Sequence, residues 1–118
     1  MLDQTFAKHF ATEWIAAWNS HDLQRVLSHY TDDFEMSSPL IAKIAGEPSC
    51  RLKGKRAVGA YWARALELNP DLHFELLTTL VGAGSVTICY QGQRGMAAEV
   101  LVFGPDNKVT HGLAHYAL

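Results

Sequence analysis

From Leu72 onward the chain consists of β-rich runs separated by short connections that contain glycine. The runs cover 72–81, 86–91, 96–103 and 108–116. Short glycine-bearing connections between runs of this kind predict β-hairpins, and therefore an antiparallel meander. Any fold for this chain must accommodate such a sheet in its C-terminal half.

The first half of the chain shows helical periodicity instead. Aromatic side chains recur every four residues from Phe6 to Trp18, which predicts an amphipathic helix over 4–18. A second short helix is expected over 23–30, because its apolar residues follow the spacing i, i+3, i+4, i+7. Alternating apolar and polar residues predict a short strand over 33–38.

A third helix is predicted by the apolar spacing of 58–66, and Asn69-Pro70 ends it. The segment from Pro39 to Gly54 has two prolines, two glycines and little periodicity, so we expect a loop there, of a length that is often functional or mobile. Helices followed by strands are the pattern of an α+β fold, in which helices cover one face of one sheet.

Length and composition argue against several classes of function. The 118 residues suit one domain, 1–118, and a net charge of -2 with 19% charged residues does not favour a nucleic-acid partner. No apolar run approaches a membrane span, and the first residues do not resemble a signal peptide, so we expect a cytoplasmic protein that does not bind membranes. Cys50 and Cys89 fit free thiols, although one disulfide bridge stays open.

In the third β-rich run, 96–103, the residues on both faces of the expected strand are apolar apart from Glu99. Both faces of the sheet are therefore expected to be covered, one by the helices and the other by a second subunit. In the last run, alternation places His111, Leu113 and His115 with Val109 on the outer face, where they would contribute to a homodimer.

Glu99 is the candidate catalytic residue. Strand parity places it on the face of Ala97, Leu101 and Phe103. A carboxyl group on a buried face is desolvated, which raises its pKa toward the range of a general acid or base. The alternative is a solvated and inert glutamate at a strand end.

The order and spacing of four segments resemble the nuclear transport factor 2-like superfamily, in its SnoaL-like and ketosteroid-isomerase-like branch. The segments are 14–23, Tyr-Thr-Asp-Asp-Phe at 30–34, Gly-Lys-Arg-Ala-Val at 54–58 and Tyr-Gln-Gly at 90–92. The resemblance covers nearly the whole chain. It implies three N-terminal helices packed in the concave face of a curved, mostly antiparallel sheet, a cystatin-like α+β cone, with dimers that pair through the outer sheet face.

The same resemblance separates this chain from a standard ketosteroid isomerase. The position of that enzyme's oxyanion-binding tyrosine falls on Trp14, and the position of its base falls on Ser38. A serine hydroxyl is not a base without a partner that takes its proton. The position of the late aspartic acid falls on Glu99, at the price of one gap, and the resemblance directs that face into the cone.

Large aromatic walls with few polar groups suit a small, largely apolar or aromatic metabolite. The residues expected to line the cavity are Trp14, Trp18, Met36, Ser38, Tyr61, Trp62, Phe74, Ile88, Tyr90, Leu101 and Tyr116. The sequence has no His-x-His, His-Glu-x-x-His or Cys-x-x-Cys motif, so neither a metal nor another cofactor is expected.

Three functions stay open at this point. The first is cofactor-free acid–base chemistry of the isomerase, dehydratase or cyclase type, with Glu99 moving a proton and Tyr61, Tyr90, Tyr116 or Trp14 donating to oxygen. The second is a binding or accessory domain that holds a ligand without turnover. The third is a filled cone whose functional part is the dimer surface.

Overall fold

The computed structural model describes residues 2–118 as four helices and six strands. The helices are α1 (Gln4–Ser20), α2 (Leu23–Leu27), α3 (Pro39–Ala45) and α4 (Gly54–Leu68). The strands are β1 (Tyr30–Ser37), β2 (Arg51–Lys53), β3 (Glu75–Gly82), β4 (Ser85–Gly92), β5 (Gly95–Phe103) and β6 (Val109–Tyr116). The expected α+β class is confirmed.

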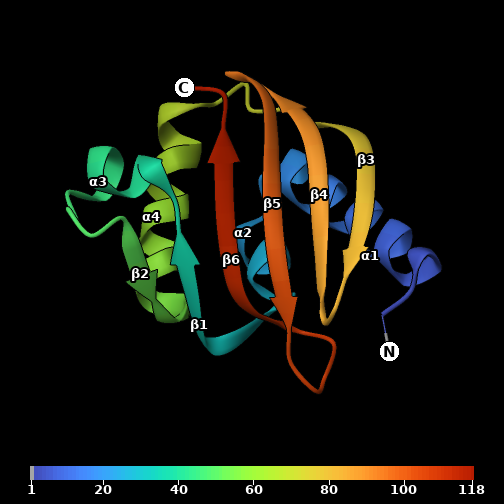
Figure 1. The fold of residues 1–118 in the computed structure, drawn as a ribbon. Helices are drawn as coiled ribbons and strands as arrows, with labels where there is room; N and C mark the ends of the chain where they lie inside the picture. Colours follow the sequence, from blue (N-terminus) through green and yellow to red (C-terminus); the bar gives the residue numbers. More distant parts are fainter. Residues whose placement is uncertain (1) are drawn as a thin grey trace.

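The strands form one sheet in the order β2-β1-β6-β5-β4-β3. The predicted meander is confirmed, because β3, β4, β5 and β6 pair antiparallel with their neighbours in sequence. Only β1 and β6 run parallel among the pairs of the described residues. In Figure 1, α1, α2 and α4 lie behind the curved sheet, with α1 behind β3 and β4 and with α4 behind β1, whereas α3 lies at the edge of the sheet beyond β1.

The boundaries of α1 follow from local chemistry. The Asp3 carboxylate accepts a hydrogen bond from the backbone N–H of Phe6 at 2.8 Å, so the predicted cap is confirmed. The helix ends at Ser20 because His21 adopts a left-handed conformation, with φ of 60°, and its N–H donates to the carbonyl of Trp18. Asp22 then caps α2 through the N–H of Arg25.

The prediction of a loop from Pro39 to Gly54 is wrong, because this segment contains α3 and β2. Ser38 caps α3 by accepting from the N–H of Leu40 at 3.1 Å, and Pro39 occupies the first turn. The three residues of β2 pair antiparallel with β1. Elements of seven and three residues are too short to show a clear period.

Several element boundaries differ from the sequence predictions, most of them by one to four residues. The second helix ends at Leu27, and Tyr30 already begins β1; β3 begins at Glu75 rather than at Leu72. Val109 does not share the outer face with His111, because the pairing register between β5 and β6 shifts there and Val109 is fully buried. His111, Leu113 and His115 are exposed on the outer face as expected.

The core lies between the helices and the sheet and is rich in aromatic rings. Tyr30 contacts Phe34 with ring centroids 4.4 Å apart, and Trp62 packs edge-on against both Tyr30 and Trp18 at 5.1 Å. Cys50 and Cys89 are free thiols. Within residues 2–118, no helix has the length and hydropathy needed to span a bilayer.

Candidate functional site

Glu99 lies at the centre of the sheet and points toward the helices. Its strand, β5, pairs it with Ile88 of β4 on one side and with Ala114 of β6 on the other. Its neighbours on the same face, Ala97 and Leu101, are buried, and Glu99 itself is 3% exposed. The predicted strand parity is therefore confirmed.

Burial determines the protonation of Glu99. Desolvation by burial raises the pKa of its carboxyl to about 8. Within residues 2–118, its Oε2 atom has no hydrogen-bond partner. At neutral pH this carboxyl is mostly protonated, yet it loses its proton within about one pH unit of neutrality, which suits a general acid or base.

The charge of an ionised Glu99 acts on all four tyrosines of the chain. Burial is the main cause that raises the pKa of each of these hydroxyls, and an ionised Glu99 raises each further; the four are Tyr30, Tyr61, Tyr90 and Tyr116. Each therefore keeps its proton at neutral pH and can donate one hydrogen bond, which Tyr61 gives to Ser38. They come from β1, α4, β4 and β6, so the fold itself gathers them around β5.

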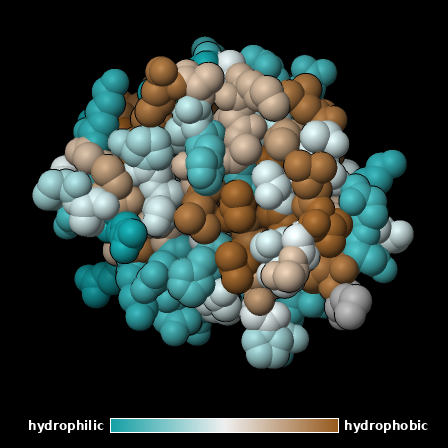
Figure 2. All heavy atoms as spheres, viewed as in Figure 1, coloured by the Kyte–Doolittle hydropathy of each residue, from teal (hydrophilic) through white to brown (hydrophobic). Residues whose placement is uncertain are grey.

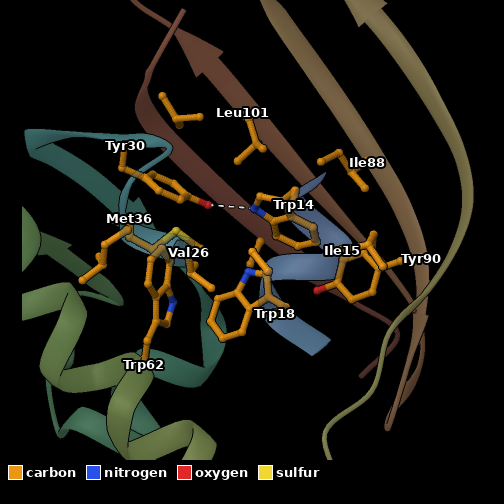
Figure 3. Close-up of a cluster of buried hydrophobic side chains, with 14 of the residues drawn as sticks. Trp14, Ile15, Trp18, Val26, Tyr30, Met36, Trp62, Ile88, Tyr90 and Leu101 are labelled. Carbon is orange, nitrogen blue, oxygen red and sulfur yellow. Dashed lines mark hydrogen bonds between the residues drawn. The ribbon is translucent and has the colours of Figure 1, made fainter. Parts of the chain in front are cut away.

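Trp14 fixes one of these hydroxyls. Its indole N–H donates to the Tyr30 hydroxyl at 3.0 Å, as the dashed line in Figure 3 shows. Both residues are buried in the layer between α1 and the sheet. Trp14 thus positions a tyrosine hydroxyl and does not present its own N–H to the cavity.

Ser38 links the capping of α3 to the tyrosines. Its Oγ atom accepts from the N–H of Leu40 and, at 3.4 Å, from the hydroxyl of Tyr61. Ser38 also helps to lower the pKa of the Tyr116 hydroxyl against the larger effect of burial. The serine is 2% exposed and serves as an acceptor in a hydroxyl cluster, which leaves it no basic role.

A cavity of about 70 Å³ opens beside this cluster, between α3, α4 and the β4–β5 hairpin. The lining residues are Leu40, Ile44, Tyr61, Ala65, Asn69, Leu72, Phe74, Tyr90, Gly92, Gln93, Arg94, Gly95, Ala97 and Tyr116. Ala97 of β5 lines the cavity, and Glu99 lies two residues further along the same face of that strand, about 7 Å away.

Four of the eleven residues expected to line the cavity do line it, namely Tyr61, Phe74, Tyr90 and Tyr116. Six others are buried in the core without lining it: Trp14, Trp18, Met36, Trp62, Ile88 and Leu101 (Figure 3). Ser38 does not line the cavity and is linked to it by the hydrogen bond from Tyr61. Contact of all eleven residues with a ligand stays a prediction.

Sequence reasoning missed the far wall of the cavity. Leu40 and Ile44 come from α3, which was expected to be a loop, and Gln93 and Arg94 come from a hairpin turn. The available signal was Ser38-Pro39, a common helix start, followed by apolar residues four apart at positions 40 and 44.

A larger hollow lies elsewhere and lacks buried chemistry. It measures about 610 Å³ and is an open depression along the polar side of α1, lined by Lys8, His9 and Glu13 among others. Glu13 is engaged there by Arg25 at 2.7 Å and by His29 at 3.0 Å. Within residues 2–118, no three His, Cys, Asp or Glu side chains come together as metal ligands would.

The comparisons with known proteins agree with this architecture. The SnoaL-like domain profile matches residues 11–115. A crystal structure of a SnoaL-like protein of unknown function from Burkholderia thailandensis is 60% identical and superposes with a TM-score of 0.94, over 98% of each chain. None of the curated proteins matches this chain.

More distant structures share the fold at low identity. One is a protein from Agrobacterium tumefaciens that is provisionally named an isomerase of the SnoaL-like family. It is 15% identical to this chain and superposes with a TM-score of 0.74, over 95% of this chain and 97% of that one. SalBIII, an epoxide hydrolase/cyclase-like enzyme of salinomycin pyran ring formation, is 14% identical, with a TM-score of 0.75 over 100% and 95%. The resemblance inferred from sequence is confirmed: this chain belongs to the family of SnoaL-like domains.

Proposed function

We propose that this protein catalyses cofactor-free acid–base chemistry on a small, largely apolar or aromatic molecule that carries a carbonyl group. The observation that carries the proposal is the buried carboxyl of Glu99, which has an oxygen without a hydrogen-bond partner within residues 2–118 and whose charge acts on four tyrosine hydroxyls. Burying an acid this way costs stability, and such costs concentrate at functional sites.

The residues divide the reaction between them. The ionised form of Glu99 takes a proton from a carbon next to the carbonyl, and the C–H electron pair moves into a new double bond while negative charge develops on the carbonyl oxygen. A tyrosine hydroxyl donates a hydrogen bond to that oxygen. Glu99 then returns the proton to a different carbon, which completes an isomerisation, or to a departing hydroxyl, which completes a dehydration.

The substrate must enter past two tyrosines. Tyr90 and Tyr116 line the cavity, whereas the buried Glu99 does not. Ligand pockets commonly measure 300–1,000 Å³, well above the 70 Å³ found here. We therefore propose that Tyr90 and Tyr116 rotate when substrate binds, bringing the carboxyl into contact with it.

The fold neighbours support this class of reaction only as a precedent. One carries the name of an isomerase and another is described as epoxide hydrolase/cyclase-like. At 15% identity or less, these structures show a shared fold, and they do not show that the functional sites are alike.

A non-catalytic ligand-binding domain is the second candidate, and Ser38 favours it. The residue at the expected base position caps α3 and accepts from Tyr61, so it takes no part in proton transfer. In that case Glu99 would hold a ligand's hydrogen-bond donor without turnover.

Hydrogen–deuterium exchange at carbon separates these candidates. 2-Indanone and similar small aromatic ketones in D₂O lose their α-protons to solvent, and NMR follows the loss. We expect the wild-type protein to accelerate this exchange, more strongly as pH rises toward 8, because the ionised carboxyl is the base. Glu99→Gln should remove the acceleration and keep ketone binding.

Glu67→Gln is the matched control, because Glu67 is exposed on α4 and is paired with Arg64. It should behave like the wild type. Equal exchange rates with wild-type protein and Glu99→Gln would contradict the catalytic proposal. Ketone binding without any acceleration by the wild type would favour the binding domain.

We also propose that a second copy of this chain covers the outer face of the sheet. Figure 2 shows hydrophobic side chains gathered on this face over the middle of the sheet. Exposed apolar residues there include Leu80, Met96 and Leu113, and the adjacent Val100 is half-buried. An apolar patch of this kind is self-complementary, as a two-fold dimer interface requires.

A further inference from the structure

Arg94 is the only charged residue among those that line the cavity within residues 2–118. It lies in the tight turn between β4 and β5, with Gln93 beside it and Asn69 also at the cavity wall. The remaining lining groups are apolar side chains, glycines and three tyrosines. The cavity therefore joins an aromatic interior to a single cationic group at its mouth.

Arg94 lines the cavity, and within residues 2–118 no ion pair neutralises its charge. Its charge reaches the Tyr61 hydroxyl, where it lowers the pKa against the larger effect of burial. In the part of the chain that the structure describes, no carboxylate lies within ion-pair distance of Arg94. By contrast, Arg25 and Arg64 each pair with a glutamate.

The region around Glu99 does not favour a negatively charged ligand group, in contrast to the surroundings of Arg94. Glu99 carries a negative charge there whenever it ionises, and the lining residues nearest to it in the sheet, Ala97, Tyr90 and Tyr116, carry no positive charge. A negatively charged group placed near Glu99 would be desolvated and opposed by the carboxylate. The same group at the mouth would face Arg94 in partly solvated surroundings.

We propose that the ligand is a small monocarboxylic acid, bound with its carboxylate against Arg94 and its apolar end directed past Ala97 toward Glu99. The inference rests on the proposed function, because it assigns the substrate class and orientation for that same cavity. The amides of Gln93 and Asn69 offer further donors to the carboxylate. The reacting carbon then lies at the end of the ligand away from the carboxylate.

The turn that carries Arg94 is suited to admit such a ligand. Gly92 and Gly95 flank Gln93 and Arg94, which are both exposed, and Gly95 has a φ of 101° that side chains rarely adopt. A Cβ on Gly92 would contact Tyr90 and Phe74 at 3.5 and 3.6 Å. The turn therefore packs closely on the rings of Tyr90 and Phe74, which line the cavity. Displacement of the turn would widen the opening of the cavity.

Benzoate and benzamide form a matched pair of probes, because they share shape and differ in charge. Binding is measured by tryptophan fluorescence and by NMR shifts of backbone amides, which locate the probe at Gly95 and Ala97. We expect benzoate to bind the wild-type protein about fivefold more tightly than benzamide at low salt, the range of a partly exposed ion pair.

Arg94→Ala should remove this preference and leave benzamide binding unchanged, whereas Arg94→Lys should keep part of it. Arg56→Ala is the control, because it removes the same charge from the surface of α4 outside the cavity. It should keep the full preference, and added salt should weaken only benzoate binding to proteins with a cation at position 94.

The outcomes separate this inference from the proposed function. Benzamide binding in the cavity without a preference for benzoate, or a preference that survives Arg94→Ala, overturns the carboxylate assignment alone. Tighter binding of benzylammonium than of benzoate also overturns it. Failure of every probe to reach the cavity overturns both proposals.

Discussion

The indole N–H of Trp14 donates to the hydroxyl of Tyr30 across 3.0 Å, and both side chains are almost completely buried. Trp18, one turn further along the same face of α1, has a buried N–H without a partner in residues 2–118. The single satisfied indole therefore joins α1 to β1 and turns the oxygen of Tyr30 toward the centre of the core, within reach of the charge on Glu99.

Replacing Tyr30 by phenylalanine should destabilise the protein by about 1–3 kcal/mol, because the buried Trp14 N–H loses its acceptor. Urea unfolding measures this change. In a Trp14→Phe background the same replacement should cost clearly less, since the hydroxyl has already lost its donor. An equal cost in both backgrounds would show that this hydrogen bond contributes little.

Glu99 should make stability fall as pH rises. In the unfolded chain this carboxyl ionises above about pH 4.5, whereas in the folded protein it keeps its proton until about pH 8. The folded state binds more protons across this window, so the free energy of unfolding should decrease by about 1 kcal/mol per pH unit and level off above pH 8.

The difference in unfolding free energy between wild type and Glu99→Gln isolates this contribution. The glutamine variant should gain stability relative to wild type between pH 5 and 8, and the two should change in parallel below pH 4. Parallel behaviour over the entire range would place the carboxyl of Glu99 in contact with water.

Gly112→Ala should destabilise the protein by about 1–3 kcal/mol. A Cβ at this position of β6 would lie 2.9 Å from the sulfur of Met36 and 3.5 Å from Leu101. Thermal unfolding checks the effect, and Met36→Val should relieve part of it by removing the sulfur. Gly59→Ala in α4 is the contrast: its closest contact is 3.4 Å, and the gain in helix propensity should offset any crowding.

Leu113→Glu should convert the proposed dimer into monomers, because it places a charge in the middle of the outer apolar face. Sedimentation velocity at micromolar concentration gives the mass directly. Leu68→Glu also adds a charge at an exposed leucine, but on α4, and should leave the dimer intact. A wild-type protein that sediments as a monomer would exclude the proposed assembly.

The strand parity of β5 could be predicted from sequence because a single polar residue interrupts an apolar run, and Glu99 takes the orientation that this pattern indicates. The register shift at Val109 could not be predicted from sequence. A bulge changes which face the following residues occupy, and nothing in the composition marks it. Helix α3 was missed for a related reason: Ser38 fixes its start through one hydrogen bond, and two turns are too few for a period to emerge.

The cavity wall was the least predictable part. Aromatic residues at helical spacing marked the interior correctly, yet Trp14, Trp18 and Trp62 pack against other rings there instead of lining open space. Which rings pack and which leave room depends on side-chain volumes from four separate elements. The cytoplasmic location and the ligand stay predictions.

Strand β6 occupies the middle of the sheet, with β1 on one side and β5 on the other. Its parallel pairing with β1 unites residues 30–37 with residues 109–116, segments far apart along the chain. During synthesis, the β2–β1 pair and the β3–β4–β5 ribbon therefore share no strand pairing until β6 emerges from the ribosome and inserts between them.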